Sequence, residues 1–165
     1  MGFKSLKWQP NGENLTTFTL DDTDRRIIAV LSDEGRISNL DLADRIGLSP
    51  TPCSRRVKRL EEAGVIMGYG ARINPTAMGQ SVSVMVQVRL SQQSPSDIEA
   101  FMSAIHRLPE ITECLLVTGN LDYVLKVQTR DVEALRDFVL KELKAIPCVS
   151  ETSTMLILDV AKSTL

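Results

Sequence analysis

Two short helix-forming segments meet at a glycine within residues 38–64, and this arrangement constrains the fold more than any other part of the chain. The first segment ends at Gly47, and the second opens at Ser49. The second segment carries four cations within residues 55–59 and no acidic residue before Glu61. Two helices joined by such a turn, the second of them basic, are typical of a helix-turn-helix that places its second helix in a DNA major groove.

A further helix is predicted upstream, over residues 22–34, where apolar residues recur on one face and acidic residues begin the first turn. The middle helix is expected to begin at Ser38, which with Asp41 resembles a capping box. It is expected to end at Gly47, because glycine adopts the left-handed conformation without a steric penalty. The three helices together predict a DNA-binding domain over residues 20–66.

The apolar residues of the last helix predict which way its cations point. Cys53, Val57 and Leu60 recur at i, i+4 and i+7 and predict a buried stripe, so all four cations are expected to turn outward. A solvated basic face on an ordinary three-helix bundle is the alternative. DNA binding is favoured because the cations are locally unbalanced and lie on the second helix of the turn. The residues expected at the DNA are Ser49, Thr51, Pro52, Ser54, Arg55, Arg56, Lys58 and Arg59.

The second half of the chain alternates strands and helices. Between residues 82 and 90, valine and leucine alternate strictly with other residues, which predicts a strand with one buried face. The elements expected after it are a helix opening at 95–97, strands at 111–118 and 123–129, a helix over 132–143 and a strand at 149–160. This βαββαβ order is the pattern of a ferredoxin-like sandwich, so the fold class of the whole chain is α+β. Its helices would cover one sheet face, and a second subunit usually hides a free face of that size, which predicts a dimer.

The turn Gly-Asn-Leu-Asp at residues 119–122 is the candidate small-molecule site. A free amino acid is a zwitterion, so its receptor needs N–H donors for the carboxylate and an acceptor for the ammonium group. Gly119 allows the turn to expose its backbone amides, and Asp122 would supply the anion. An ordinary hairpin turn chosen for positive φ is the alternative.

Several runs of this sequence closely resemble the Lrp/AsnC family of feast/famine transcriptional regulators. The matching runs are Leu20-Asp21 with Asp24-Arg25, DEGRIS at 33–38, GLSPTPC at 47–53, Arg56-Val57 through Arg59-Leu60-Glu61, Gly64-Val65-Ile66 with Gly68-Tyr69, and VTGNLDY at 117–123. The run GLSPTPC is highly specific, whereas Asn120 stands where many relatives have Asp. The resemblance spans about residues 20–160. It implies an N-terminal DNA reader and a ferredoxin-like module that dimerises, assembles further and senses amino acids.

The resemblance also implies where an effector binds. In relatives, this turn and nearby strand ends hold an amino acid at a contact between dimers. The effector residues implied by position are Leu115, Thr118, Gly119, Asn120, Asp122, Met155, Leu156 and Ile157. The expected function is therefore a sequence-specific transcriptional regulator that binds double-stranded DNA, responds to an amino acid and forms dimers or a higher oligomer such as an octamer. The alternative is an architectural DNA-binding protein without an effector.

Composition argues against several other classes of protein. The net charge of −2 is unlike that of a uniformly basic nucleic-acid binder, so the clustering of cations matters more than their total. Cys53, Cys114 and Cys148 form no paired motif, which predicts neither a metal site nor a disulfide framework and indicates a reducing compartment. The single histidine, His106, accompanies no nucleophile motif or phosphate loop, so neither catalysis nor a cofactor is expected.

Targeting signals and domain boundaries complete the sequence-based expectations. No apolar run approaches the ~20 residues that a membrane span needs, and no secretory segment is recognised. The protein is therefore expected in the cytoplasm, associated with the nucleoid and without a membrane partner. Residues 1–19 are expected to form a flexible tail or an arm that reaches a partner, 67–79 a linker strand, 80–160 the ferredoxin-like domain and 161–165 a tail.

Overall fold

The computed structural model describes residues 18–162, so the tails expected at 1–19 and 161–165 lie largely outside the described residues. The chain divides between residues 71 and 72 into two compact units, a helical unit and a sheet unit. The division falls within the segment where the linker was expected. None of the helices between residues 18 and 162 has the length and apolar character needed to cross a membrane.

The described part of the helical unit consists of three helices, as the sequence predicts. Their bounds are α1 (Asp22–Asp33), α2 (Asn39–Ile46) and α3 (Pro50–Glu62). Ile27 of α1 and Ile46 of α2 are buried in one core with Cys53 and Leu60 of α3, and Val57 packs against it. The predicted stripe of α3 is therefore confirmed as its packing face, and burial of these side chains fixes the rotation of α3 about its own axis.

The helix starts use the available caps differently. The carboxylate of Asp21 accepts the N–H of Asp24 at 2.8 Å, and the carboxylate of Asp24 accepts the N–H of Asp21 at 3.3 Å, which completes a capping box on α1. The Ser38 hydroxyl accepts the N–H of Asp41 at 3.1 Å, but the Asp41 carboxylate binds that hydroxyl instead of the Ser38 N–H. The predicted box on α2 is therefore half formed. Ser49 caps α3 without a side-chain hydrogen bond, because prolines remove two of the first three N–H donors.

Gly47 ends α2 with φ 71° and ψ 40°, as predicted. Replacing it by Ala should lower the free energy of unfolding by about 1 kcal/mol, because a residue with a Cβ is strained in the left-handed conformation. No atom lies within 4 Å of the position that the new Cβ would occupy, so backbone strain is the whole effect. Urea denaturation measures it, with Gly70→Ala as a control at an equally open position outside the left-handed region. Equal stability of the two variants would contradict this account of the turn.

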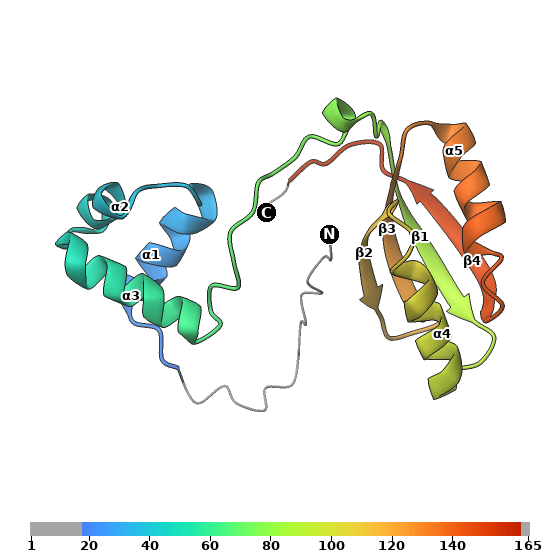
Figure 1. Ribbon diagram of the computed structural model, residues 1–165, viewed down its shortest axis with the longest axis horizontal. Helices are drawn as coiled ribbons and strands as arrows, with labels where there is room; N and C mark the ends of the chain where they lie inside the picture. Colours follow the sequence, from blue (N-terminus) through green and yellow to red (C-terminus); the bar gives the residue numbers. More distant parts are fainter. Residues whose placement is uncertain (1–17, 163–165) are drawn as a thin grey trace. The chain divides into compact units, whose positions relative to one another are not determined.

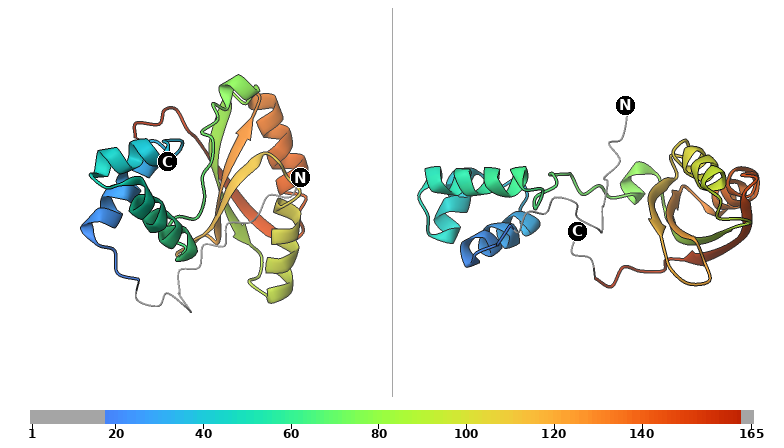
Figure 2. Two further views of the ribbon diagram at one scale, coloured as in Figure 1. Left: turned by 60° about the vertical axis from the view of Figure 1, so that its left-hand side comes forward. Right: turned by 90° about the horizontal axis from the view of Figure 1, so that it is seen from below.

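The sheet unit has the predicted βαββαβ order. Its elements are β1 (Val82–Leu90), α4 (Pro95–Ile105), β2 (Ile111–Leu116), β3 (Tyr123–Thr129), α5 (Val132–Asp137), a π-helical continuation of α5 (Phe138–Leu143) and β4 (Val149–Leu156). The strands form one antiparallel sheet in the order β2-β3-β1-β4. Helices α4 and α5 lie on the same face of this sheet (Figures 1 and 2). Phe101 of α4 and Phe138 after α5 join Val86 and Leu125 of the two central strands in one buried core.

Three segments differ from their predicted bounds. The last strand ends at Leu156 rather than at residue 160, although the N–H of Ile157 still donates to the carbonyl of Ser83 at 3.0 Å. In the register that pairs Val84 with Leu156, the first residue of β1, Val82, stands opposite residue 158, so residues 159 and 160 have no partner on β1. The second strand ends at Leu116, where the turn toward β3 begins. The predicted linker strand at residues 67–79 pairs with no strand among the described residues and instead contains a short 3-10 helix, η1 (Thr76–Met78). A strand is stabilised by its neighbour, and this segment has none within the described chain.

Candidate nucleic-acid interface and effector turn

One exposed face of α3 gathers polar and basic side chains. Thr51, Ser54, Arg55 and Lys58 are spaced at i, i+3, i+4 and i+7, so they project from the same side of the helix, opposite its buried stripe. They line a shallow hollow of about 410 Å³ together with Pro50 and Asn39 of α2. The nearest anion to the Lys58 ammonium is Glu62, one helical turn on, at 3.6 Å. Such an exposed pair is weak, and Arg55 is exposed and forms no ion pair within the described residues, so both cations on this face are available to phosphate or base edges.

Asn39 is a member of this surface that the sequence reasoning missed. It is the first residue of α2, and its side-chain amide donates to the carbonyl of Pro50 at 2.9 Å. This bond joins the start of α2 to the start of α3 and so sets the spacing of the two helices at the hollow. Its position after the Ser38 cap marks a helix start, but no sequence pattern reveals the residue eleven positions ahead that it contacts.

The other two cations of α3 form ion pairs with carboxylates at the start of α1, although the Arg59 side chain remains 48% exposed. The Arg56 guanidinium binds Asp21 at 2.7 Å and Asp24 at 2.8 Å, and that of Arg59 binds Asp24 at 2.5 Å. The expectation that all four cations turn freely outward therefore does not hold for Arg56 and Arg59, which carboxylates of the same protein bind. The physical reason is that these two positions lie between the buried stripe and the basic face, beside the acidic first turn of α1.

Electrostatic coupling across this contact acts on both partners. The N–H of Asp24, and next the Arg56 guanidinium, hold the pKa of the Asp21 carboxyl below its usual range. In turn, Asp21 and then Asp24 raise the pKa of Arg56. Of the remaining predicted residues, Ser49 is exposed at the start of α3, whereas Pro52 is half-buried.

The turn between β2 and β3, which includes residues 119–122 and is called the effector turn below, has four backbone N–H groups without a hydrogen-bond acceptor in the described chain. The N–H groups of Thr118, Gly119, Asn120 and Leu121 donate no hydrogen bond to any other residue within the described range 18–162. Gly119 has φ 119°, a conformation that favours glycine. The N–H of Val117 donates to the carbonyl of Asp122 at 2.9 Å, which closes the turn at its base. Four successive open amides are a suitable receptor for a carboxylate.

Asp122 has a different place from the one predicted. Its side chain is buried, and its two carboxylate oxygens accept the N–H of Leu90 at 2.7 Å and the side-chain amide of Gln93 at 2.5 Å. It therefore anchors the turn to the end of β1. Arg89, which the sequence reasoning missed, supports the turn from the sheet side, because its guanidinium donates to the carbonyl of Asn120 at 2.8 Å. It also pairs with Glu151 of β4 at 3.2 Å.

The predicted effector residues fall into two separate groups. Leu115 lies at the end of β2 that leads into the turn, whereas Met155 lies on β4 at the opposite edge of the sheet. Two strands lie between them, so the edges are roughly 14 Å apart at the usual strand spacing. Met155 also pairs with Met85 near the start of β1, while Asp122 binds its far end. Within one subunit, residues 155–157 therefore do not meet the turn.

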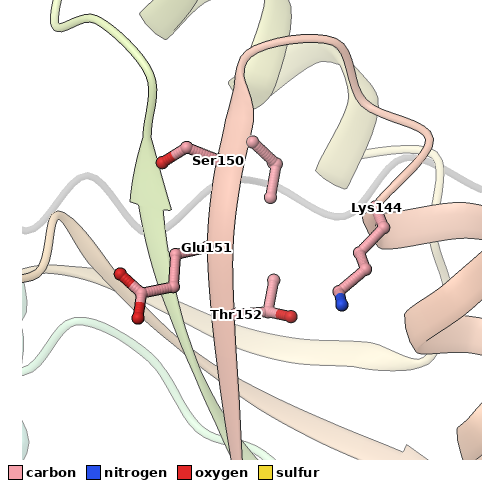
Figure 3. Close-up of a pocket in the computed structure, with 5 residues that line it drawn as sticks. Lys144, Ser150, Glu151 and Thr152 are labelled. Carbon is pink, nitrogen blue, oxygen red and sulfur yellow. The ribbon is translucent and has the colours of Figure 1, made fainter.

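A further hollow of about 250 Å³ runs along β4 and contains none of the predicted site residues (Figure 3). It is lined by Lys144, Val149, Ser150, Glu151 and Thr152. Among the residues from 18 to 162, no three His, Cys, Asp or Glu side chains gather as a metal-binding group.

The helical unit has a basic helix-turn-helix, and the sheet unit has a turn with open backbone N–H groups. Together they are typical of a DNA-binding regulator with a separate ligand-binding domain. Comparison with known proteins agrees. The family model described as Lrp/AsnC ligand binding domain matches residues 83–165, and one for a winged helix-turn-helix matches residues 20–67. The chain belongs to the Lrp/AsnC family of transcriptional regulators, which confirms the predicted fold class and DNA-binding function.

Individual relatives cover most of the chain. The leucine-responsive regulatory proteins of Klebsiella pneumoniae and Escherichia coli K12 are each 43% identical over 143 residues, which is 87% of this chain and 87% of each relative. Among solved structures, the transcriptional regulator NMB0573 from Neisseria meningitidis, in complex with L-Met, has a TM-score of 0.84 at 33% identity and covers 88% of this chain and 94% of its own. AsnC of E. coli has a TM-score of 0.79 at 26% identity, covering 88% and 97%.

Proposed function

We propose that the protein reads a specific DNA sequence through the exposed face of α3. The observation that carries this proposal is the surface formed by Asn39, Thr51, Ser54, Arg55 and Lys58, where two cations are available beside short polar side chains. Arginine reads guanine edges, lysine neutralises phosphate, and hydroxyl groups bind either. As a transcriptional regulator acts on the chromosome, the protein is expected with the nucleoid in the cytoplasm.

In vitro selection from a random duplex library tests this proposal with the full chain. The selected duplex should bind at least about 10³-fold more tightly than non-specific DNA at physiological salt, as expected for direct reading of bases. Binding that is tight but indifferent to sequence would contradict specific reading. It would favour an architectural protein that contacts only the phosphate backbone.

The proposal includes an amino-acid effector, with its carboxylate on the amides of residues 118–121. Three observations support it: the open donors of the turn, the match to a ligand-binding domain and the L-Met complex of a structural neighbour. The Asp122 carboxylate already binds Leu90 and Gln93, so the ammonium group of the effector is not assigned to it. Asp122 and Arg89 instead hold the turn in place.

A second subunit is part of the proposed effector site. Leu115 and the segment 155–157 lie at opposite edges of one sheet, so they line a common site only if another subunit brings them together. Exposed apolar side chains on β2 and β4, among them Leu116, Met155 and Leu156, are also consistent with burial by another copy. We therefore propose a dimer that assembles further, with an octamer as one possible end state.

A thermal-shift screen of the twenty amino acids, followed by sedimentation, tests the effector proposal. One or a few amino acids should stabilise the protein, by about 2.7 kcal/mol at 100-fold excess over Kd, and should change its assembly. Gly119→Ala should lose this response because Ala is strained at φ 119° and displaces the amides. Asn120→Ala should keep it, since only the backbone of Asn120 is used, its carbonyl by Arg89 and its N–H by the effector. A flat screen would favour the effector-independent alternative.

A further inference from the structure

Asp24 is a buried carboxylate at the contact between α1 and α3. Its side chain has no exposed surface, yet it lies within hydrogen-bond distance of two guanidinium groups, those of Arg56 and Arg59. Asp21 adds a second carboxylate to Arg56, and the ring of Phe18 lies 5.0 Å from the Arg59 guanidinium. A carboxylate taken this far out of water is stable only when it is paired, so these bonds are held tightly in the folded unit.

This contact occupies two of the four cations of α3. Of its four cations, Arg56 and Arg59 are bound by α1, and their two positive charges are matched by Asp21 and Asp24. Arg55 and Lys58 keep their charge for a duplex. The sequence-independent affinity for DNA increases with the number of phosphates that a protein neutralises. Additional phosphate contacts do not add contacts to the bases, which carry the specificity.

We infer that Asp24 is a specificity-determining residue for DNA binding. By holding Arg56 and Arg59 against α1, it keeps them from phosphates and so limits non-specific affinity, while the face that includes Arg55 and Lys58 reads the sequence. Asp24 itself touches no DNA in this role and acts through the two arginines. The inference rests on the DNA-binding function of α3 but not on the identity of the target sequence.

The salt dependence of binding to a non-specific duplex, poly(dI-dC), tests this role in the full chain. Asp24→Asn keeps the shape of the side chain but removes its charge, which releases Arg59 and leaves Arg56 bound by Asp21 alone. The slope of log K against log salt concentration should then steepen by up to about 1.8, or about 0.9 per new phosphate contact, and affinity near 0.1 M salt should rise on the order of tenfold. The preference for a selected duplex over poly(dI-dC) should fall. An unchanged or shallower slope would overturn the inference.

A matched control separates this local effect from the loss of one negative charge. Asp22 lies two residues earlier on α1, is exposed and forms no ion pair within the described residues. Asp22→Asn changes the net charge equally but releases no arginine, so its slope should match that of the unaltered protein. Equal steepening in the two variants would show that only net charge matters and would also overturn the inference.

A second comparison does not depend on the folding of Asp24→Asn. In the protein with Asp24 intact, Arg56→Gln should leave the slope unchanged, because that guanidinium is already occupied. Arg55→Gln should make the slope shallower by about 0.9. If the two variants reduce the slope equally, Arg56 contacts phosphate in the unaltered protein, and the inference that Asp24 holds it away from DNA is refuted. If the unaltered protein shows no salt-dependent binding to DNA, the proposed DNA-binding function is wrong. If it does bind but Asp24→Asn has the same slope, only the inference about Asp24 is wrong.

Discussion

The double variant Arg55→Ala/Lys58→Ala is expected to bind its selected duplex far more weakly than the unaltered protein while folding equally well. Arg55 should contribute about 1–3 kcal/mol if it reads a base, and Lys58 should add a phosphate contact whose loss lowers affinity for all sequences. Both side chains are exposed, and the Lys58–Glu62 pair at 3.6 Å is too weak to matter for stability. A gel-shift titration at fixed salt measures the loss, and thermal unfolding measures the retained fold.

Two further variants serve as controls, because they remove cations that lie outside the exposed face of α3. Arg45→Ala removes a cation from α2 that is bound at 2.8 and 2.9 Å by Glu34, so DNA affinity should change little. Arg56→Ala should mainly lower the free energy of unfolding, because it leaves the buried Asp24 carboxylate short of one partner. If the double variant binds as tightly as the unaltered protein, the assignment of this face to DNA is wrong.

The DNA reader shows what periodicity along a helix predicts and where it stops. The spacing of Cys53, Val57 and Leu60 correctly predicts the buried stripe, because a helical repeat places these residues on one side whatever the partner is. It does not predict what lies beside that stripe. The carboxylate that binds Arg56 and Arg59 lies 32 and 35 residues earlier in the chain, so only the packing of α1 against α3 brings it there.

The effector turn shows a similar limit in the sheet unit. Alternation along β1 and the glycine of the turn predict the strands and their connection correctly. The role of Asp122 depends instead on the far end of β1, where the pairing with β3 stops at Val88 and Tyr123 and the register with β4 shifts after Arg89. The N–H of Leu90 then needs an acceptor from outside the ladder, and the Asp122 side chain supplies it. A local motif contains no information on this irregularity.

Asp122→Ala is accordingly expected to destabilise the sheet unit and not simply to remove a ligand contact. Hydrogen bonds to a charged group are worth about 1.5–3 kcal/mol each, and this change breaks two, leaving the buried N–H of Leu90 without an acceptor. A loss of about 3 kcal/mol in the free energy of unfolding is expected, measured by urea denaturation followed by circular dichroism. The amino-acid response should be lost as well, because the turn that presents the amides is no longer anchored.

The conservative change Asp122→Asn separates anchoring from charge. Its amide oxygen can still accept the N–H of Leu90, so the variant should recover about half of the lost stability and part of the amino-acid response. Asn120→Ala should unfold like the unaltered protein, since its side chain makes no hydrogen bond among the described residues. If Asp122→Ala keeps full stability while calorimetry shows that amino-acid binding has vanished, the carboxylate contacts the ligand directly. In that case the sequence-based assignment of Asp122 to the ammonium group is right, and the anchoring role is wrong.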